Sequence, residues 1–188
     1  MKYILATHNI NKINEIKPLL KNIKIISLKE LNYNKDIIEN GKTFKDNALI
    51  KAKTIYDEFK IPVISDDSGL LVKSLNNQPG INSKGYSNKG DLENNLKILK
   101  NLEGIKDRTA EFVTVICLYD GIKPLFFKGV MQGVISSEIK GEDGFGYDPI
   151  FIPKGFNKTI SELGMSVKEE ISHRTKAINS LVNYLTME

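Results

Sequence analysis

The chain has 188 residues, of which 40% are hydrophobic and 27% are charged, and this length is typical of one domain with a sizeable core. The composition excludes disordered and membrane-spanning chains, and a single cysteine excludes an internal disulfide framework. The net charge is +4, but all except two of the 27 basic residues are lysines scattered along the chain, which predicts a solvated surface and not a nucleic-acid-binding patch. We therefore expect a cytoplasmic protein with no nucleic-acid or membrane partner.

Predicted strands and helices alternate at the start of the chain. Residues 3–6 are typical of a short buried strand, residues 13–20 follow a helical pattern, and residues 23–28 predict a second strand. Thr43 is a good N-cap for a helix that we expect to run to about Phe59. This alternation favours an α/β protein.

The middle of the chain contains a short strand, a loop and a helix. Residues 63–65 predict a strand that ends in the turn Asp66-Asp67-Ser68-Gly69, with residues 70–72 extended again. The Asn-, Gly- and Ser-rich residues 76–90 predict a loop, and Asp91 is a suitable cap for a helix to about Leu102.

The last third predicts a hairpin, a glycine-rich loop and a final helix. The hairpin strands are residues 112–119 and 125–130, the loop is residues 141–149, and the helix covers about 172–185. Together the elements predict a single α/β domain over residues 1–188, with a mixed twisted sheet flanked by helices.

Polar residues gather at the ends of these elements, where a sheet covered by helices places its ligand cleft. The first cluster consists of Thr7, His8, Asn9, Ile10, Asn11 and Lys12. Backbone N–H groups at a helix start, a side-chain amide and an early lysine suit a phosphate. Alternatively, Asn9 or Asn11 is a plain helix cap and Lys12 is solvated.

The second cluster lies around the start of the predicted helix after Thr43. Asn47 and Lys51 are four residues apart on the edge of its apolar stripe, and Glu39 and Gly41 precede the helix. Lys51 either extends its amine to solvent or reaches an anion in a cleft.

The third cluster is Asp66, Asp67 and Ser68. Because successive residues of a strand point to opposite faces, we expect the two aspartates to have different roles. One aspartate is suited to bind a hard cation, and the other to brace the turn. Two adjacent carboxylates at the end of a buried strand also need a metal or a lysine to compensate their charge. The alternative is an ordinary Asp-rich turn before glycine.

The fourth cluster joins the loop Gly144-Phe145-Gly146-Tyr147-Asp148-Pro149 with Lys168 and Ser172-His173-Arg174. Phe145 or Tyr147 suits stacking on a flat base, or both rings pack inward. Arg174 lies on the apolar side of the last helix, so it needs either a ligand or a buried acidic partner.

With these clusters the chain resembles the inosine triphosphate pyrophosphatase family, the non-standard purine nucleoside triphosphate (XTP/dITP) diphosphatases. The resemblance rests on the following motifs in the family's order: Thr7-x-Asn9-x-x-Lys12, Glu39-x-Gly41-x-Thr43-Phe44-x-x-Asn47-Ala48-x-x-Lys51-Ala52, Asp66-Asp67-Ser68-Gly69-Leu70, Pro79-Gly80, Gly144-Phe145-Gly146-Tyr147-Asp148-Pro149-Ile150-Phe151, and Lys168 with Ser172-His173-Arg174. It implies a Mg²⁺-dependent enzyme with its active site in a cleft between two lobes, usually a homodimer, that converts ITP, dITP or XTP to the monophosphate and pyrophosphate.

The resemblance also implies roles for individual residues. Glu39 and Asp67 hold Mg²⁺, and Asp67 is the catalytic base that orients water at the α-phosphorus. The residues expected to bind substrate are Thr7, His8, Asn9, Ile10, Asn11, Lys12, Lys51, Ser68, Phe145, Gly146, Tyr147, Asp148, Lys168, His173 and Arg174. Among these, Asn9, Lys12 and Lys51 hold phosphate, Phe145 stacks on the purine, and Asp148, Lys168, His173 and Arg174 surround its edge.

The sequence departs from the family pattern at two places. His8 stands where many bacterial members have glycine, and Lys84-Gly85 stands where many have Ala-Arg. The second departure leaves open whether a basic residue of that loop contributes. A purine-nucleotide-binding regulator without hydrolysis is the alternative function, against which the intact Glu39 and Asp67 argue.

Overall fold

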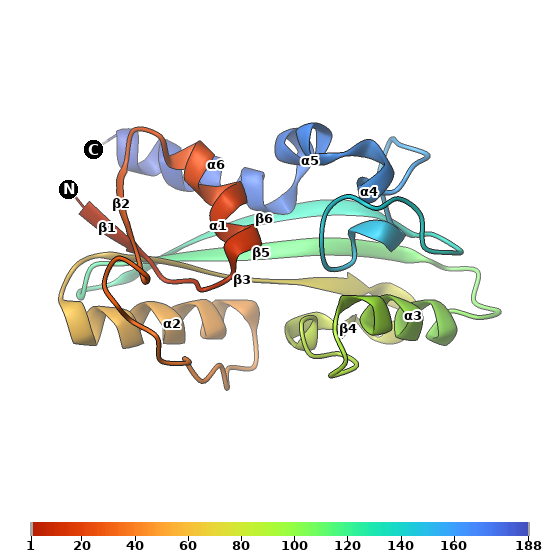
Figure 1. Cartoon of the computed structure of the whole chain (residues 1–188), viewed down its shortest axis with the longest axis horizontal. Helices are drawn as coiled ribbons and strands as arrows, with labels where there is room; N and C mark the ends of the chain where they lie inside the picture. The colour runs from red at the N-terminus through yellow and green to blue at the C-terminus, as the bar shows by residue number, and fades with distance from the viewer. Residues whose placement is uncertain (1, 188) are drawn as a thin grey trace. The chain divides into compact units, whose positions relative to one another are not determined.

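The computed structural model describes residues 2–187, and they form two compact units (Figure 1). Unit 1 comprises the residues up to Asp67, Thr114–Gly129 and the residues from Arg174 on, while unit 2 comprises Ser68–Val113 and Val130–His173. Three long strands, β3 (Val63–Val72), β5 (Thr109–Tyr119) and β6 (Pro124–Ile135), each contribute residues to both units.

The remaining elements belong to one unit each, except that α6 starts at the last residue of unit 2. Those of unit 1 are β1 (Lys2–Leu5), α1 (Ile10–Ile16), η1 (Lys17–Leu20), β2 (Lys24–Ser27), α2 (Phe44–Phe59) and α6 (His173–Thr186). Those of unit 2 are η2 (Lys73–Leu75), β4 (Gln78–Pro79), η3 (Gly80–Asn82), α3 (Asp91–Asn101), η4 (Asp148–Ile150), β7 (Phe151–Pro153), α4 (Ile160–Leu163) and α5 (Met165–Ile171).

The sheet is mixed, as the sequence predicted. Its strand order is β2-β1-β3-β5-β6-β7, with β4 paired to β3. In unit 1, β1 pairs in parallel with both β2 and β3. In unit 2, β4 pairs with the end of β3 and β7 pairs with the end of β6, both antiparallel.

The sheet in unit 1 has a separate apolar core on each face, because successive strand residues alternate between them. Ile4 and Val63 pack with Ala48, Ala52 and Ile55 of α2. The next residues along the strands, Leu5 and Ile64, pack instead with α1 and α6, through residues that include Ile16, Ala177, Ile178 and Leu181. In Figure 1, α2 runs along one side of the strands of unit 1, and α1 and α6 lie on the other.

Helix α2 begins and ends as the sequence predicted. The Thr43 hydroxyl accepts a hydrogen bond from the Asp46 backbone N–H, so it caps the helix. At the other end, Lys60 adopts a left-handed conformation and its N–H donates to the Tyr56 carbonyl, which stops the helix after Phe59.

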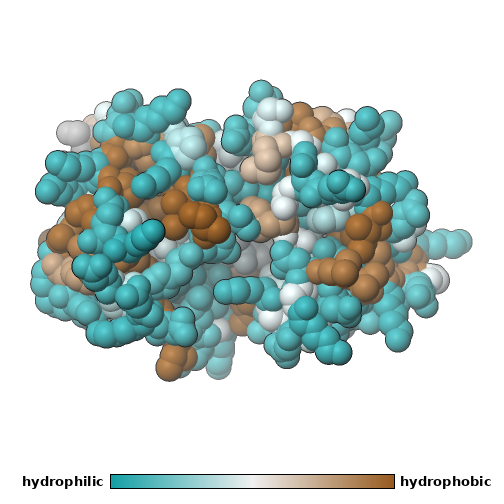
Figure 2. All heavy atoms as spheres, in the orientation of Figure 1, coloured by the Kyte–Doolittle hydropathy of each residue, from teal (hydrophilic) through white to brown (hydrophobic). Residues whose placement is uncertain are grey.

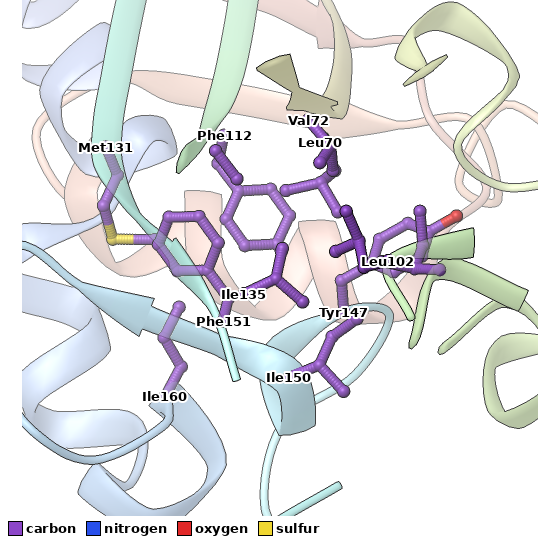
Figure 3. Close-up of a cluster of buried hydrophobic side chains, with 12 residues drawn as sticks. Leu70, Val72, Leu102, Phe112, Met131, Ile135, Tyr147, Ile150, Phe151 and Ile160 are labelled. Carbon is purple, nitrogen blue, oxygen red and sulfur yellow. The ribbon is translucent and has the colours of Figure 1, made fainter. Parts of the chain in front are cut away.

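Unit 2 has one core, which lies between α3, the strands and the segment after β6 (Figure 3). Leu70 and Val72 of β3 contact this cluster together with Ile98 and Leu102 of the α3 region, and the aromatic pair Phe112–Phe151 lies within it. The α3 prediction was accurate to one residue, but the N-cap is Gly90 and not Asp91. Helices α4 and α5 were not predicted, because their short stretches lack a full apolar period.

The sequence prediction for residues 66–69 was also wrong. The segment Asp66–Gly69 is not a turn that ends a short strand, since β3 continues without a break from Val63 to Val72. Parallel pairing with β1 holds its first residues, and antiparallel pairing with β4 holds its last residues. Turn propensity was therefore overridden by pairing within the sheet.

The surface agrees with the lysine-rich composition. Figure 2 shows hydrophilic residues distributed over the viewed face, with smaller hydrophobic patches between them. Among the described residues 2–187, no helix is long and apolar enough to cross a membrane.

Candidate active site

Asp66 and Asp67 lie within β3 and have different partners. Ser65, one residue earlier, donates its hydroxyl hydrogen to the Ala48 carbonyl of α2. Asp66 contacts Lys12 of α1, and Asp67 again faces α2, where it contacts Asn47. The strand alternation thus directs two adjacent carboxylates into two separate environments, as the sequence predicted.

Asp66 forms a buried ion pair with Lys12, whose Nζ lies 2.7 Å from Asp66 Oδ2. Burial by itself raises the pKa of Asp66, but the positive charges of Lys12, Arg174 and Lys51 hold it well below its ordinary value. The pKa of Lys12 is lowered by burial, which the Asp66 charge only partly offsets. Asp66 is therefore ionised at neutral pH and fixes the amine of Lys12.

Arg174 of α6 also belongs to unit 1, where its guanidinium donates to Glu15 Oε2 of α1. Both side chains are buried. The buried acidic partner that the sequence left open is thus present, and Glu15 was not identified as a site residue from the sequence. Contact of Arg174 with a purine stays a prediction.

Asp67 is held from α2. Asn47 Nδ2 donates to Asp67 Oδ2 at 3.0 Å, and Lys51 Nζ lies 4.0 Å from Asp67 Oδ1. Lys51 Nζ also donates to Glu39 Oε2 at 2.8 Å. One amine therefore contacts both carboxylates of the predicted metal site, and Lys51 does not extend into solvent.

Asn47 connects the Glu39 loop to the strand. Its Oδ1 accepts a hydrogen bond from the Gly41 backbone N–H at 2.8 Å while its Nδ2 holds Asp67. A Cβ at residue 41 would lie 2.6 Å from Asn47 Oδ1, so this approach requires glycine. The sequence analysis placed Asn47 beside Lys51 but gave Asn47 no role. The spacing of Asn47 from Gly41 and Lys51 is the sequence feature that could have indicated this role.

The pKa of Asp67 is shifted in the opposite direction from that of Asp66. Burial raises the pKa of Asp67, and the charges of Lys51 and Lys12 and the hydrogen bond from Asn47 only partly counteract it. Burial lowers the pKa of Lys51, but Asp66, Asp67 and Glu39 outweigh it, so the net shift is upward. Asp67 is thus the more basic of the two aspartates, which suits a group that accepts or orients a proton.

The residues from Thr7 to Lys12 form a capped turn into α1. Asn9 Oδ1 accepts from the backbone N–H groups of Asn11 and Lys12, and Thr7 Oγ1 accepts from the Asn9 N–H. Asn9 is therefore the helix cap that the sequence allowed, whereas Lys12 is paired and not solvated. His8 is exposed and stacks on Tyr33, with the ring centroids 6.1 Å apart.

In unit 2, Lys168 lies between an acid and an aromatic ring. Its Nζ donates to Asp148 Oδ2 at 2.6 Å and lies 4.0 Å from the centroid of the Phe145 ring, a cation–π geometry. The same Asp148 oxygen accepts from the Phe145 backbone N–H at 2.9 Å. Asp148 and Lys168 are both buried, while Phe145 is half-buried.

The loop that carries Phe145 is fixed from α3. Asp91 Oδ2 accepts from the Gly146 N–H, and Asn95 Nδ2 donates to the Gly146 carbonyl. The Tyr147 hydroxyl donates to the Ser83 carbonyl at 2.6 Å, and burial raises the pKa of this tyrosine. Phe145 and Tyr147 therefore differ, since only Tyr147 is packed inward. Nothing in the sequence signalled that Asp91 and Asn95 hold this loop, because their partner Gly146 is more than 50 residues away.

His173 is buried in the same unit and stacks on Phe112, with the ring centroids 4.8 Å apart and the planes at 10°. Ser68, half-buried at the start of the unit 2 part of β3, and the exposed Ile10 and Asn11 complete the predicted set. Contact between any of these residues and a nucleotide stays a prediction.

The residues present suit a hard divalent cation. Among residues 2–187 there is no cluster of three His, Cys, Asp or Glu side chains arranged as a metal cage. Glu39 and Asp67 are instead two carboxylates that face one amine. Mg²⁺ commonly uses one or two carboxylates and completes its shell with waters and substrate phosphates, so this pair fits it.

Comparison with known proteins identifies the family of the chain. A model of the Ham1 family matches residues 3–184. The chain belongs to the Ham1 family. The family resemblance inferred from the sequence motifs is thereby confirmed.

Ham1 relatives match along nearly their whole length. The chain is 44% identical over 192 residues to the dITP/XTP pyrophosphatase of Caldanaerobacter subterraneus, covering 98% of this chain and 96% of that protein. It is 43% identical to the dITP/XTP pyrophosphatase of Christiangramia forsetii, covering 99% and 100%.

Solved Ham1 structures confirm the predicted fold, a mixed sheet flanked by helices. The Staphylococcus aureus Ham1 protein matches with a TM-score of 0.91 at 39% identity, covering 99% of this chain and 98% of that one. A HAM1 protein from Coxiella burnetii matches with a TM-score of 0.93 at 38% identity over the full length of both chains.

Proposed function

We propose that this chain is a nucleoside triphosphate pyrophosphatase that converts ITP, dITP and XTP to the monophosphate and pyrophosphate, and so clears non-standard purines from the nucleotide pool. The observation that carries the proposal is the contact of Lys51 with both Glu39 and Asp67. Two carboxylates and an amine at one place are what a metal-bound polyphosphate requires. The names of relatives at 43–44% identity support the same reaction.

Phosphate recognition is assigned to unit 1. A triphosphate carries about four negative charges near neutral pH, which amines and a divalent cation must offset. Lys12 and Lys51 supply the amines, and the capped turn at Asn9 supplies polar groups beside them. Asp66 keeps Lys12 in place, because its carboxylate is buried and stays ionised.

Water activation is assigned to Asp67. When bound by Glu39 and Asp67, Mg²⁺ would neutralise phosphate charge and lower the pKa of a coordinated water. Asn47 holds one oxygen of Asp67, so the other oxygen would face the cation and a water coordinated to it. Phosphoryl chemistry needs little covalent help from the protein, so positioning and electrostatics provide most of the rate.

Base recognition is assigned to unit 2. Phe145 offers an aromatic face to the purine, and Lys168 is a fixed donor beside that ring. Hypoxanthine and xanthine carry an oxo acceptor at position 6, whereas adenine carries an amino donor there. A donor facing a donor leaves a buried polar group unsatisfied, which costs about 1–3 kcal/mol and gives roughly 5- to 150-fold discrimination.

The decisive experiment is a panel of nucleoside triphosphates with Mg²⁺ in which pyrophosphate and orthophosphate release are measured separately. We expect pyrophosphate from ITP, dITP and XTP, much less from ATP, and none in the presence of EDTA. Tight ITP binding without any product would instead identify a nucleotide-binding regulator. Mg²⁺ as the cation, a homodimer as the assembly and the cytoplasm as the location are further parts of this proposal.

A further inference from the structure

We propose that Lys51 competes with the divalent cation for Glu39 and Asp67, so that cation binding releases its amine to the phosphates. The inference rests on the proposed function, because it concerns the metal and phosphate roles assigned above. It goes beyond them by making Lys51 a group with two alternative partners, carboxylates when the cation is absent and phosphate when the cation is bound.

The geometry shows one amine in the position that a cation would need. Lys51 Nζ donates to Glu39 Oε2 at 2.8 Å and lies 4.0 Å from Asp67 Oδ1. The Lys51 side chain is only 11% exposed, so its charge has these carboxylates as neighbours and little bulk water. A cation that bound the same oxygens would face the ammonium as a like charge, which makes simultaneous occupancy unfavourable.

The two oxygens of Asp67 have separate partners. Oδ2 accepts from Asn47, a neutral amide that a cation does not repel. Oδ1 faces Lys51. Asn47 therefore keeps the carboxylate oriented while the partner of the other oxygen changes, and the Gly41 N–H on Asn47 Oδ1 keeps the Glu39 loop beside it.

Lys12 does not share this behaviour, although it also belongs to the charged cluster. It forms its ion pair with Asp66, which lies on the opposite face of β3 from Asp67. Arg174 pairs with Glu15 of α1. Lys51 is therefore the amine whose contacts include both Glu39 and Asp67, and the proposed displacement concerns this residue.

The amine of Lys51 has the means to move. Its stem leaves α2 beside Ala48 and Ala52, which are small and fully buried, and a lysine side chain has four rotatable carbons before its ammonium. Glu39 lies outside any helix or strand and its side chain is 38% exposed. The Glu39 side of the 2.8 Å contact is therefore open to solvent, and the Lys51 amine can move by rotation about its side-chain bonds.

The first test titrates Mn²⁺ alone, without nucleotide, into the wild-type protein and into Lys51→Met by calorimetry. Removing the competitor should tighten Mn²⁺ binding on the order of tenfold, the scale of one hydrogen bond to a charged group. Lys53→Met is the matched control, since it removes an exposed lysine of the same helix, and it should leave the affinity within about twofold. Equal or weaker Mn²⁺ binding by Lys51→Met overturns the proposal.

The second test uses the wild-type chain and so does not depend on the folding of a variant. Acetylation of Lys51 by an amine-reactive ester is followed by peptide mass spectrometry with and without saturating Mg²⁺. A released amine should react several-fold faster with Mg²⁺, while Lys53 keeps its rate. An unchanged or slower Lys51 rate contradicts the release. Failure of the proposed function would appear separately, as absence of pyrophosphate in the substrate panel.

Discussion

The charged groups of unit 1 and unit 2 are built on different principles. In unit 1, three amino or guanidinium groups and four carboxylates from separate segments form several ion pairs, and Lys51 contacts two acids at once. In unit 2, one buried pair, Lys168–Asp148, is covered by the ring of Phe145 and tied to the backbone. The proposed function uses the first arrangement to exchange partners with a polyanion and a cation, and the second as a fixed donor that selects the base.

We expect Asp67→Asn to have the largest effect on the activity assigned to unit 1. An amide cannot act as a base and binds a hard cation poorly, so we expect the turnover number for ITP with Mg²⁺ to fall by about 10³-fold or more. Because burial raises the pKa of Asp67, ionisation of this group opposes folding at neutral pH. The variant should therefore stay folded with an equal or higher Tm.

The control for this variant is Asp57→Asn, which alters an exposed acid of α2 and should keep full activity. Activity is measured as pyrophosphate release, and folding by circular dichroism. Near-normal ITP hydrolysis by Asp67→Asn would remove the catalytic role from this residue.

Lys168→Met should break the fixed pair of unit 2. Both side chains are 3% exposed, and loss of one partner leaves a buried carboxylate, which costs about 3–5 kcal/mol of the free energy of unfolding. Urea unfolding measures the loss. Lys35→Met is the comparison, because its pair with Glu58 is exposed and should cost at most about 1 kcal/mol.

A second substitution tests whether the pair itself is responsible. Lys168→Met combined with Asp148→Asn removes the buried charge and keeps an acceptor for the Phe145 N–H. It should recover part of the lost stability. If the double variant is as unstable as the sum of both single variants, the two side chains act independently.

Arg174→Ala decides to which unit the discrimination between bases belongs. If Arg174 reads the purine, the ratio of kcat/KM for ITP over ATP should fall by roughly 5- to 150-fold. Glu15 holds Arg174 within unit 1, so a purely structural role would lower both values together. An unchanged ratio would leave base selection to unit 2, and Glu15→Gln serves as the companion variant.

The smallest expected effect concerns Cys117, whose thiol can be used to measure the stability of unit 1 without any substitution. It is the chain's single cysteine, and it is buried in the core beneath α2, where burial raises the pKa of its thiol to about 12. When folding raises the pKa of an acid, its contribution to stability is fully present at a pH below the pKa of the unfolded chain. This contribution is lost as the pH rises towards the pKa of the folded chain. Stability should therefore decline from about pH 9 towards pH 12.

Labelling of Cys117 measures this protection directly. At pH 8 the folded chain should react with a disulfide reagent at least about 100-fold more slowly than the chain in urea, since the thiolate is the reactive form. Lys168→Met should not accelerate the reaction if the disturbance stays in unit 2. Rapid labelling of the native protein would show that the sheet of unit 1 opens readily.

Much of the local structure followed from the sequence. Thr43 predicted the start of α2, and strand alternation predicted that Asp66 and Asp67 would point to opposite faces of the strand. These features depend on neighbours in the chain, through capping and a period of two residues. The motif order also predicted the family, which the comparisons confirmed.

The partners of the charged residues could not be predicted from the sequence. The sequence identified Arg174 as a residue that needed a partner, but Glu15 lies 159 residues earlier. The continuity of β3 through Asp66–Gly69 was missed because a local turn pattern says nothing about pairing with β1 and β4. The hydrogen bonds of Asp91 and Asn95 to Gly146 had no local signal in the sequence.

The sequence by itself determined which chemical groups this protein has and on which side of its strands and helices they lie. Capping, periodicity and side-chain alternation act over a few residues, so they can be read along the chain. Only the tertiary structure decided which acid meets which amine, because burial makes an unpaired charge costly and the partner is supplied by whichever segment packs there. The contact of Lys51 with Glu39 and Asp67, on which the proposed function depends, is of this second kind.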